Sequence, residues 1–182
     1  MTRHCLVLGG ARSGKTAFAE GLALHAGSKP AYLATASVLD SEMHDRVRSH
    51  QASRGERFTT IEEPIELSHA LLKATKVHDV ILVDCLTLWI TNLLLANDDV
   101  ATAVSELYAT LEEIQQAKVI LVSNEVGLGI VPDNAMARTF RDLAGSAHQR
   151  LAQICDDVYF IAAGLPLTMK GDAPGALSQA AP

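Results

Sequence analysis

The chain has 182 residues, a formal net charge of −6 and a hydrophobic fraction of 48%. This length and composition suit one domain with a single buried core. The acidic balance argues against a general nucleic-acid-binding protein, because the chain has no excess of Lys or Arg to cover phosphates. The cysteines Cys5, Cys85 and Cys155 are far apart and form no C-x-x-C pair. We therefore expect all three to be small, unpaired core residues, and the protein to work in the reducing cytoplasm.

Residues 9–16 carry the strongest motif of the chain. Their sequence, GGARSGKT, matches the phosphate-binding pattern G-x-x-x-x-G-K-[ST]. Glycines allow the backbone to turn its N–H groups inward around phosphate oxygens. The lysine of this motif reaches the β and γ phosphates, and the hydroxyl that follows it can ligate Mg²⁺. We therefore expect nucleotide contacts from Gly9, Gly10, Ala11, Arg12, Ser13, Gly14, Lys15 and Thr16.

The segments on both sides of this motif are those that a phosphate-binding loop requires. An apolar strand at residues 4–8 precedes it and a helix at residues 16–24 follows it, so the helix dipole favours an anion at the loop. The pattern then predicts, in chain order, a strand at 31–36, a charged helix from Asp40 or Ser41 to about residue 53, a strand at 58–62, a helix at 64–74 and a strand at 80–84.

The most apolar stretch is residues 80–96. Asp84 and Asn92 interrupt it, and we interpret it as a strand followed by a helix at 87–96 rather than as a membrane span. Asp84 ends the buried strand, where a carboxylate can hold Mg²⁺ opposite Thr16. The alternative is that Asp84 is only a structural acid at the end of a strand.

The second half of the chain continues the alternation of helices and strands. It predicts a helix at 100–116, a strand at 118–123, a polar loop at 124–132, a helix capped by Asp133 or Asn134 that runs to about residue 155, a strand at 158–162 and an edge strand at 165–170. The tail at 171–182 is rich in Gly, Pro, Ala and Ser, so we expect it to be disordered and the domain to span residues 1–170.

This alternation predicts an α/β fold of the P-loop NTPase type, with a mostly parallel central sheet between two layers of helices. Ligands of such sheets gather at the carboxyl ends of the strands. The phosphate loop, Thr35, Asp84, Asn124 and Glu125 all follow or end a predicted strand, so we expect them to lie together.

The charged helix predicted after residue 40 contains a candidate nucleophile. Arg46, His50 and Arg54 are spaced i, i+4, i+8 and would share one helical face. Two neighbouring cations disfavour a protonated imidazole, so His50 would remain neutral and nucleophilic near pH 7. From these residues alone, an exposed histidine on a solvated helix is the simpler interpretation. His44 is the competing histidine, although it lies off this face.

Taken together, the motifs resemble the bifunctional adenosylcobinamide kinase/adenosylcobinamide-phosphate guanylyltransferase family of cobalamin biosynthesis. The most specific segments are N-E-V-G-L-G-I-V-P at 124–132 and R-V-R-S-H at 46–50. Further matching segments lie at 9–16, 32–36, 40–43, 60–64, 84–87, 91–94, 138–145 and 148–151. The resemblance covers about residues 4–170.

The resemblance implies two reactions on small-molecule substrates. ATP or GTP phosphorylates the hydroxyl of adenosylcobinamide, and GTP then transfers GMP to the new phosphate through a GMP–histidine intermediate. The histidine at the matching position is His50, and Lys15 is the catalytic lysine. The implied metal is Mg²⁺, held by Thr16 and Asp84, and the implied assembly is a homotrimer. Nucleotide contacts carry over to the phosphate loop and to Ala34, Thr35, Ala36, Gln51, Ala52, Ser53, Arg54, Glu62 and Asp84.

The chain departs from the family pattern at two positions. Gln51 stands where a basic residue is frequent, which could weaken nucleotide binding, and His148 stands where Asn is common. The sequence leaves Glu125 open between a loop cap and a catalytic group, and it favours Trp89 as a core or subunit-contact residue. Two other classes of function remain as alternatives: a monofunctional small-molecule kinase without covalent nucleotide, and a nucleotide-dependent switch without turnover.

Overall fold

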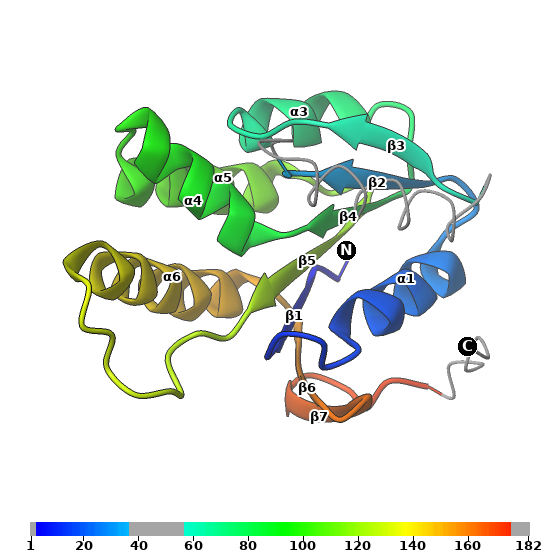
Figure 1. The fold of residues 1–182 in the computed structure, drawn as a ribbon. Helices are drawn as coiled ribbons and strands as arrows, with labels where there is room; N and C mark the ends of the chain where they lie inside the picture. The colour runs from blue at the N-terminus through cyan, green and yellow to red at the C-terminus, as the bar shows by residue number, and fades with distance from the viewer. Residues whose placement is uncertain (1–2, 37–56, 176–182) are drawn as a thin grey trace.

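The computed structural model describes residues 3–36 and 57–175, and these form a seven-stranded sheet between helices (Figure 1). The strand order is β3-β2-β4-β5-β1-β6-β7, in which only β7 is antiparallel to its neighbour. The strands are β1 (Cys5–Gly9), β2 (Pro30–Ala34), β3 (Thr59–Glu62), β4 (Val80–Asp84), β5 (Lys118–Asn124), β6 (Asp157–Ala162) and β7 (Leu165–Lys170). The helices are α1 (Lys15–Ala26), α3 (Leu67–Ala74), α4 (Leu86–Ala96), α5 (Val100–Glu113) and α6 (Ala135–Ile154).

Alternate residues of the central strands enter two separate cores, because successive side chains of a strand point to opposite faces. Leu6 and Leu8 of β1 pack with α3, α4, α5 and α6, whereas Cys5 and Val7 pack with Ala19 of α1. Figure 1 shows the same division, with α1 on one face of the sheet and the other helices on the opposite face. The predicted three-layer α/β fold is therefore confirmed.

Most predicted elements are present, with differences at their ends. Asn134 caps α6 by accepting hydrogen bonds from the N–H groups of Met136 and Ala137, as predicted. The strand predicted to reach residue 36 ends at Ala34, and α5 ends at Glu113 rather than at residue 116. The helix predicted from residue 64 begins at Leu67. The charged helix predicted between residues 40 and 53 lies outside the described residues.

Both ends of the described chain are attached to β6. Near the N-terminus, Arg3 forms an ion pair with Asp157 at 2.7 Å. Near the C-terminus, the carbonyl oxygen of Asp172 accepts a hydrogen bond from the Tyr159 hydroxyl at 2.9 Å. The disorder predicted for the tail therefore stays a prediction for residues 176–182, which lie outside the description. None of the helices in the described parts of the chain has the length and apolar character that a membrane crossing requires.

All three cysteines are buried and free, as expected from their spacing. Burial raises the pKa of the Cys85 thiol to about 11 and that of Cys155 to about 12, because desolvation penalises a thiolate. Thiols of this kind behave as small core residues rather than as nucleophiles.

His4 makes the stability of the protein depend on pH. Its Nδ1 accepts the N–H of Val119 at 3.2 Å and its Nε2 donates to the carbonyl of Leu111 at 3.0 Å, an arrangement that requires the neutral ring. Burial lowers the pKa of His4. The unfolded chain therefore binds the extra proton at a higher pH than the folded one, and stability falls as the pH drops below about 6.5.

We expect the His4→Gln variant to show a shallower loss of unfolding free energy between pH 7 and pH 5. The difference in slope is at most about 1.4 kcal/mol per pH unit, which is the contribution of one proton. Urea unfolding at several pH values measures it, with the exposed His25→Gln as the matched control. Parallel slopes in wild type and His4→Gln would show that His4 contributes nothing to the acid sensitivity.

Candidate functional site

The phosphate loop connects β1 to α1 and has the backbone that its glycines allow. Gly14 has a φ of 94°, which favours glycine, and Arg12 also adopts a left-handed φ of 56°. A Cβ on Gly9 would lie 2.6 Å from the carbonyl oxygen of Ile161 on β6. The turn between β6 and β7 supports the loop from outside, because the Gly164 N–H donates to the carbonyl of Ser13 at 2.8 Å.

Lys15 lies inside this loop and is only 8% exposed. Its Nζ donates to the carbonyl oxygen of Gly10 at 3.1 Å, which holds the ammonium group over the loop. α1 begins at Lys15 with no side-chain cap and no acidic residue in its first turn. Its N-terminal N–H groups are therefore left for an anion, as the sequence predicted.

Asp84 and Thr16 meet at the carboxyl end of β4. The Thr16 hydroxyl donates to Oδ2 of Asp84 at 2.9 Å, and the hydroxyl of Tyr32 donates to the same oxygen at 2.9 Å. Sequence reasoning missed Tyr32. The feature that could have revealed it is a tyrosine in the middle of a buried strand, because a buried phenolic hydroxyl requires a polar partner. That strand, β2, pairs with β4, which ends at Asp84.

These two oxygen-bearing side chains fit Mg²⁺, which proteins hold through one or two carboxylates together with substrate phosphates and water. Over residues 3–36 and 57–175, no group of three or more His, Cys, Asp or Glu could hold a metal. A metal ion at Asp84 and Thr16 would therefore complete its coordination with phosphate oxygens and water.

The segment after β2 is fixed to the end of β4. Thr35 is fully buried, its hydroxyl donates to the Cys85 carbonyl at 2.7 Å, and its carbonyl accepts from the Asn92 amide at 2.8 Å. The polar groups of Thr35 are thus bonded to the protein, whereas Ala34 and Ala36 are partly exposed. Glu62 is exposed at the end of β3 and pairs in register with Ala34.

The remaining predicted site residues lie outside the described part of the chain. They are His50, Gln51, Ala52, Ser53 and Arg54, and with them the arginine face proposed for His50. Their placement relative to the phosphate loop stays a prediction.

A polar cluster that the sequence only partly suggested lies at the end of β5. The N–H of Glu125 donates to the carbonyl of Gly9 at 3.0 Å, which fixes Glu125 beside the phosphate loop. Its Oε2 lies 3.7 Å from Nδ1 of His148, and Nε2 of His148 lies 2.7 Å from Oγ of Ser123. Burial lowers the pKa of His148, and the Glu125 carboxylate opposes that effect by raising it. The lowered pKa leaves His148 neutral near pH 7.

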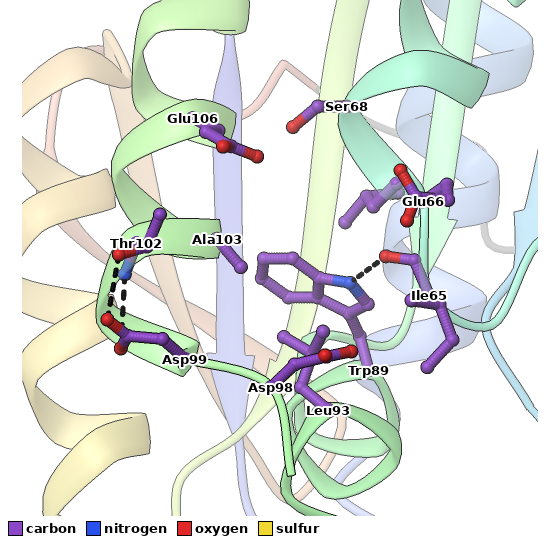
Figure 2. Close-up of a pocket in the computed structure, with 11 residues that line it drawn as sticks. Ile65, Glu66, Ser68, Trp89, Leu93, Asp98, Asp99, Thr102, Ala103 and Glu106 are labelled. Carbon is purple, nitrogen blue, oxygen red and sulfur yellow. Dashed lines mark hydrogen bonds between the residues drawn. The ribbon is translucent and has the colours of Figure 1, made fainter. Parts of the chain in front are cut away.

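A separate pocket lies between α3, α4 and α5 (Figure 2). Trp89 forms one wall, and its indole N–H donates to the Ile65 carbonyl at 2.8 Å. Trp89 is 2% exposed, which agrees with its prediction as a core residue. The pocket has a volume of about 250 Å³, below the roughly 300–1,000 Å³ that is common for ligand sites. The phosphate loop therefore remains the centre of the candidate site.

A family model described as cobinamide kinase / cobinamide phosphate guanyltransferase matches residues 5–169. A Pseudomonas aeruginosa protein named bifunctional adenosylcobalamin biosynthesis protein CobP is 46% identical over 169 residues, covering 92% of this chain and 97% of that protein. A Salmonella typhimurium protein named bifunctional adenosylcobalamin biosynthesis protein CobU is 40% identical over 181 residues, covering 91% of this chain and 98% of that protein.

Solved structures agree with the fold. The crystal structure of the RadB recombinase matches with a TM-score of 0.50 and 18% identity, covering 87% of this chain and 73% of that chain. At this identity the match supports the P-loop NTPase fold and says nothing about substrate.

Proposed function

Because this chain belongs to the cobinamide kinase / cobinamide phosphate guanyltransferase family, we propose that it catalyses both reactions on adenosylcobinamide. In the first reaction, ATP or GTP phosphorylates the hydroxyl of adenosylcobinamide. In the second, GMP from GTP is joined to that phosphate to give adenosyl-GDP-cobinamide and pyrophosphate. The observation that carries this proposal is the complete phosphate loop, with Asp84 bonded to Thr16, inside a family match over residues 5–169.

The kinase reaction follows from the arrangement of the loop. Backbone N–H groups of the loop and of the first turn of α1 would bind the phosphates, and Lys15 would neutralise charge on the β and γ phosphates. Thr16 and Asp84 would hold Mg²⁺, which supplies charge compensation between the phosphate oxygens when it is bound. Tyr32 orients the carboxylate of Asp84 by its hydrogen bond.

The guanylyl transfer requires a nucleophile, and we propose His50. Its neutral imidazole would attack the α phosphorus of GTP and expel pyrophosphate, and the substrate phosphate would then take the GMP from the histidine. Family resemblance and the predicted Arg46–His50–Arg54 face support this assignment. We propose Ala34, Ala36, Glu62 and residues 51–54 as further nucleotide contacts, on the same resemblance.

The proposal is tested by supplying adenosylcobinamide, ATP, GTP and Mg²⁺ and separating the products by liquid chromatography and mass spectrometry. We expect adenosylcobinamide phosphate to form first and adenosyl-GDP-cobinamide to follow. Phosphorylation without the second product, and without a GMP adduct on the protein, would indicate a monofunctional kinase instead. GTP binding without either product would indicate a switch.

We expect Asp84→Asn to raise the Mg²⁺ concentration needed for half-maximal kinase activity and to lower the maximal rate. The amide keeps the size of the side chain but loses the charge that attracts a divalent cation. Mg²⁺ titrations of both proteins measure the shift, with the surface substitution Asp98→Asn as the matched control. If the two titrations superimpose, Asp84 is a structural acid only.

We also propose that the protein works in the cytoplasm and forms a homotrimer, as the family resemblance implies. The exposed edge strand β7 supports an oligomer, because its apolar side chains Leu165, Leu167 and Met169 are each at least 59% exposed. Light scattering of the purified protein tests this, and a monomeric mass at micromolar concentration would contradict it.

A further inference from the structure

Three polar side chains from β5, the loop after it and α6 meet behind the phosphate loop. His148 is 6% exposed, and its Nε2 lies 2.7 Å from the hydroxyl of fully buried Ser123. Its Nδ1 faces Oε2 of Glu125 at 3.7 Å and has no hydrogen-bond partner among the described residues. The group that faces this buried nitrogen is therefore the Glu125 carboxylate, at the distance of an ion pair rather than of a hydrogen bond.

Two groups face the oxygens of the Glu125 carboxylate, the Nδ1 atom of His148 and the N–H of Gly127. A carboxylate facing Nδ1 favours the tautomer that carries its proton there, with Nε2 accepting the Ser123 hydroxyl proton. On its other side, Oε1 of Glu125 accepts the N–H of Gly127, where a Cβ would lie 2.9 Å from that oxygen. The Glu125 side chain is still 21% exposed, so a bound molecule can reach it.

Glu125 is also placed at the end of the loop where the terminal phosphate binds. Its N–H is bonded to Gly9, and the ammonium group of Lys15 is bonded to the adjacent Gly10. Because the lysine of this motif reaches the β and γ phosphates, a nucleotide bound in the loop would place its γ phosphate on the side of the loop where Glu125 is attached.

The two reactions differ in their need for a base. The kinase acceptor is a neutral hydroxyl, which must lose a proton as it attacks phosphorus. The acceptor of GMP is a phosphate, which is already ionised near pH 7. The first step of guanylyl transfer uses a neutral imidazole, whose lone pair is free. A general base is therefore required in the kinase reaction alone.

We propose that Glu125 is the general base of the kinase reaction and that His148 is the positioning residue that holds its carboxylate. The proton of the acceptor hydroxyl passes to the Glu125 carboxylate while the oxygen forms its bond to the γ phosphorus. The bond between that phosphorus and the bridging oxygen breaks, and the nucleoside diphosphate leaves with the electron pair. This inference rests on the proposed kinase activity and names a further catalytic residue for it.

The first test is Glu125→Gln, measured in single turnovers with saturating ATP and adenosylcobinamide. Glutamine keeps an oxygen to accept the Gly127 N–H but cannot accept a proton. We expect the kinase rate constant to fall on the order of 10²-fold, with the half-saturating ATP concentration and the rate of GMP-adduct formation unchanged. An unchanged kinase rate would overturn the proposal, and so would an equal loss of both reactions.

The second test separates positioning from structure at His148. We expect His148→Leu to lower the kinase rate about tenfold and His148→Asn to restore it, because the amide can donate to Glu125. His148→Leu combined with Glu125→Gln should be no slower than Glu125→Gln alone, since both act through one carboxylate. Additive losses would overturn the positioning role, and thermal melting reports whether each variant folds.

The outcomes distinguish this inference from the proposed function. A wild-type protein with no kinase activity on adenosylcobinamide would refute the proposed function itself. Normal wild-type activity with an unaffected Glu125→Gln variant would refute the inference alone. His69→Asn, a substitution of an exposed histidine on α3, is the matched control and should leave both reactions unchanged.

Discussion

Lys15→Ala should lower the kinase rate by on the order of 10³-fold at saturating ATP, because negative charge on the β and γ phosphates is then left uncompensated. In the free protein, the Lys15 ammonium is already held over the loop by the Gly10 carbonyl, so little reorganisation is required when phosphates arrive. The formation of adenosylcobinamide phosphate, followed by mass spectrometry, measures the effect.

Two controls make this result specific to the loop. Lys29→Ala removes an exposed lysine elsewhere and should leave the rate unchanged. Lys15→Ala loses a single hydrogen bond to Gly10, so its thermal unfolding should stay close to that of wild type. Full kinase turnover by a folded Lys15→Ala protein would show that the loop does not bind the transferred phosphate in the proposed way.

His50→Ala should abolish guanylyl transfer while leaving at least part of the kinase activity. The phosphate loop, with Lys15 and Thr16, is untouched, whereas the proposed covalent intermediate can no longer form. Wild-type protein incubated with α-labelled GTP and Mg²⁺ should carry a label that is lost in acid and survives alkali, as expected for a phosphorus–nitrogen bond. Peptide mapping should place the label on His50.

His44→Ala is the matched control, because His44 lies in the same segment and should not affect labelling. A label that persists in His50→Ala but disappears in His44→Ala would move the nucleophile to His44. If neither wild type nor variant is labelled while kinase activity is intact, the enzyme is a monofunctional kinase.

Much of the fold could be predicted from local patterns. β4 was predicted with both ends correct, since its β-branched run is bounded by Asp79 and closed by Asp84. The edge strand β7 was also correct. Errors fell where tertiary contacts decide the end of an element. Thr35 was assigned to a strand, but its hydroxyl donates to the Cys85 carbonyl and its own carbonyl accepts from the Asn92 side chain, so β2 ends at Ala34.

The site was predictable where a motif specifies the backbone and unpredictable where distant segments meet. The phosphate loop and Asp84 follow from glycine spacing and from one buried strand. The contact between Tyr32 and Asp84 depends on the pairing of β2 with β4, and that between Glu125 and His148 depends on the packing of α6 over β5. No spacing in the sequence encodes either contact.

The place of β1 in the sheet has a consequence for synthesis of the chain. β1 is made first, yet its two neighbours are β5 and β6, at residues 118–124 and 157–162. The loop that follows β1 is further supported by Gly164. On the ribosome, the nucleotide-binding motif therefore emerges early but has neither edge of its strand paired until most of the chain has followed. Any product that ends before β6 carries the whole phosphate-binding motif without the structure that shapes it.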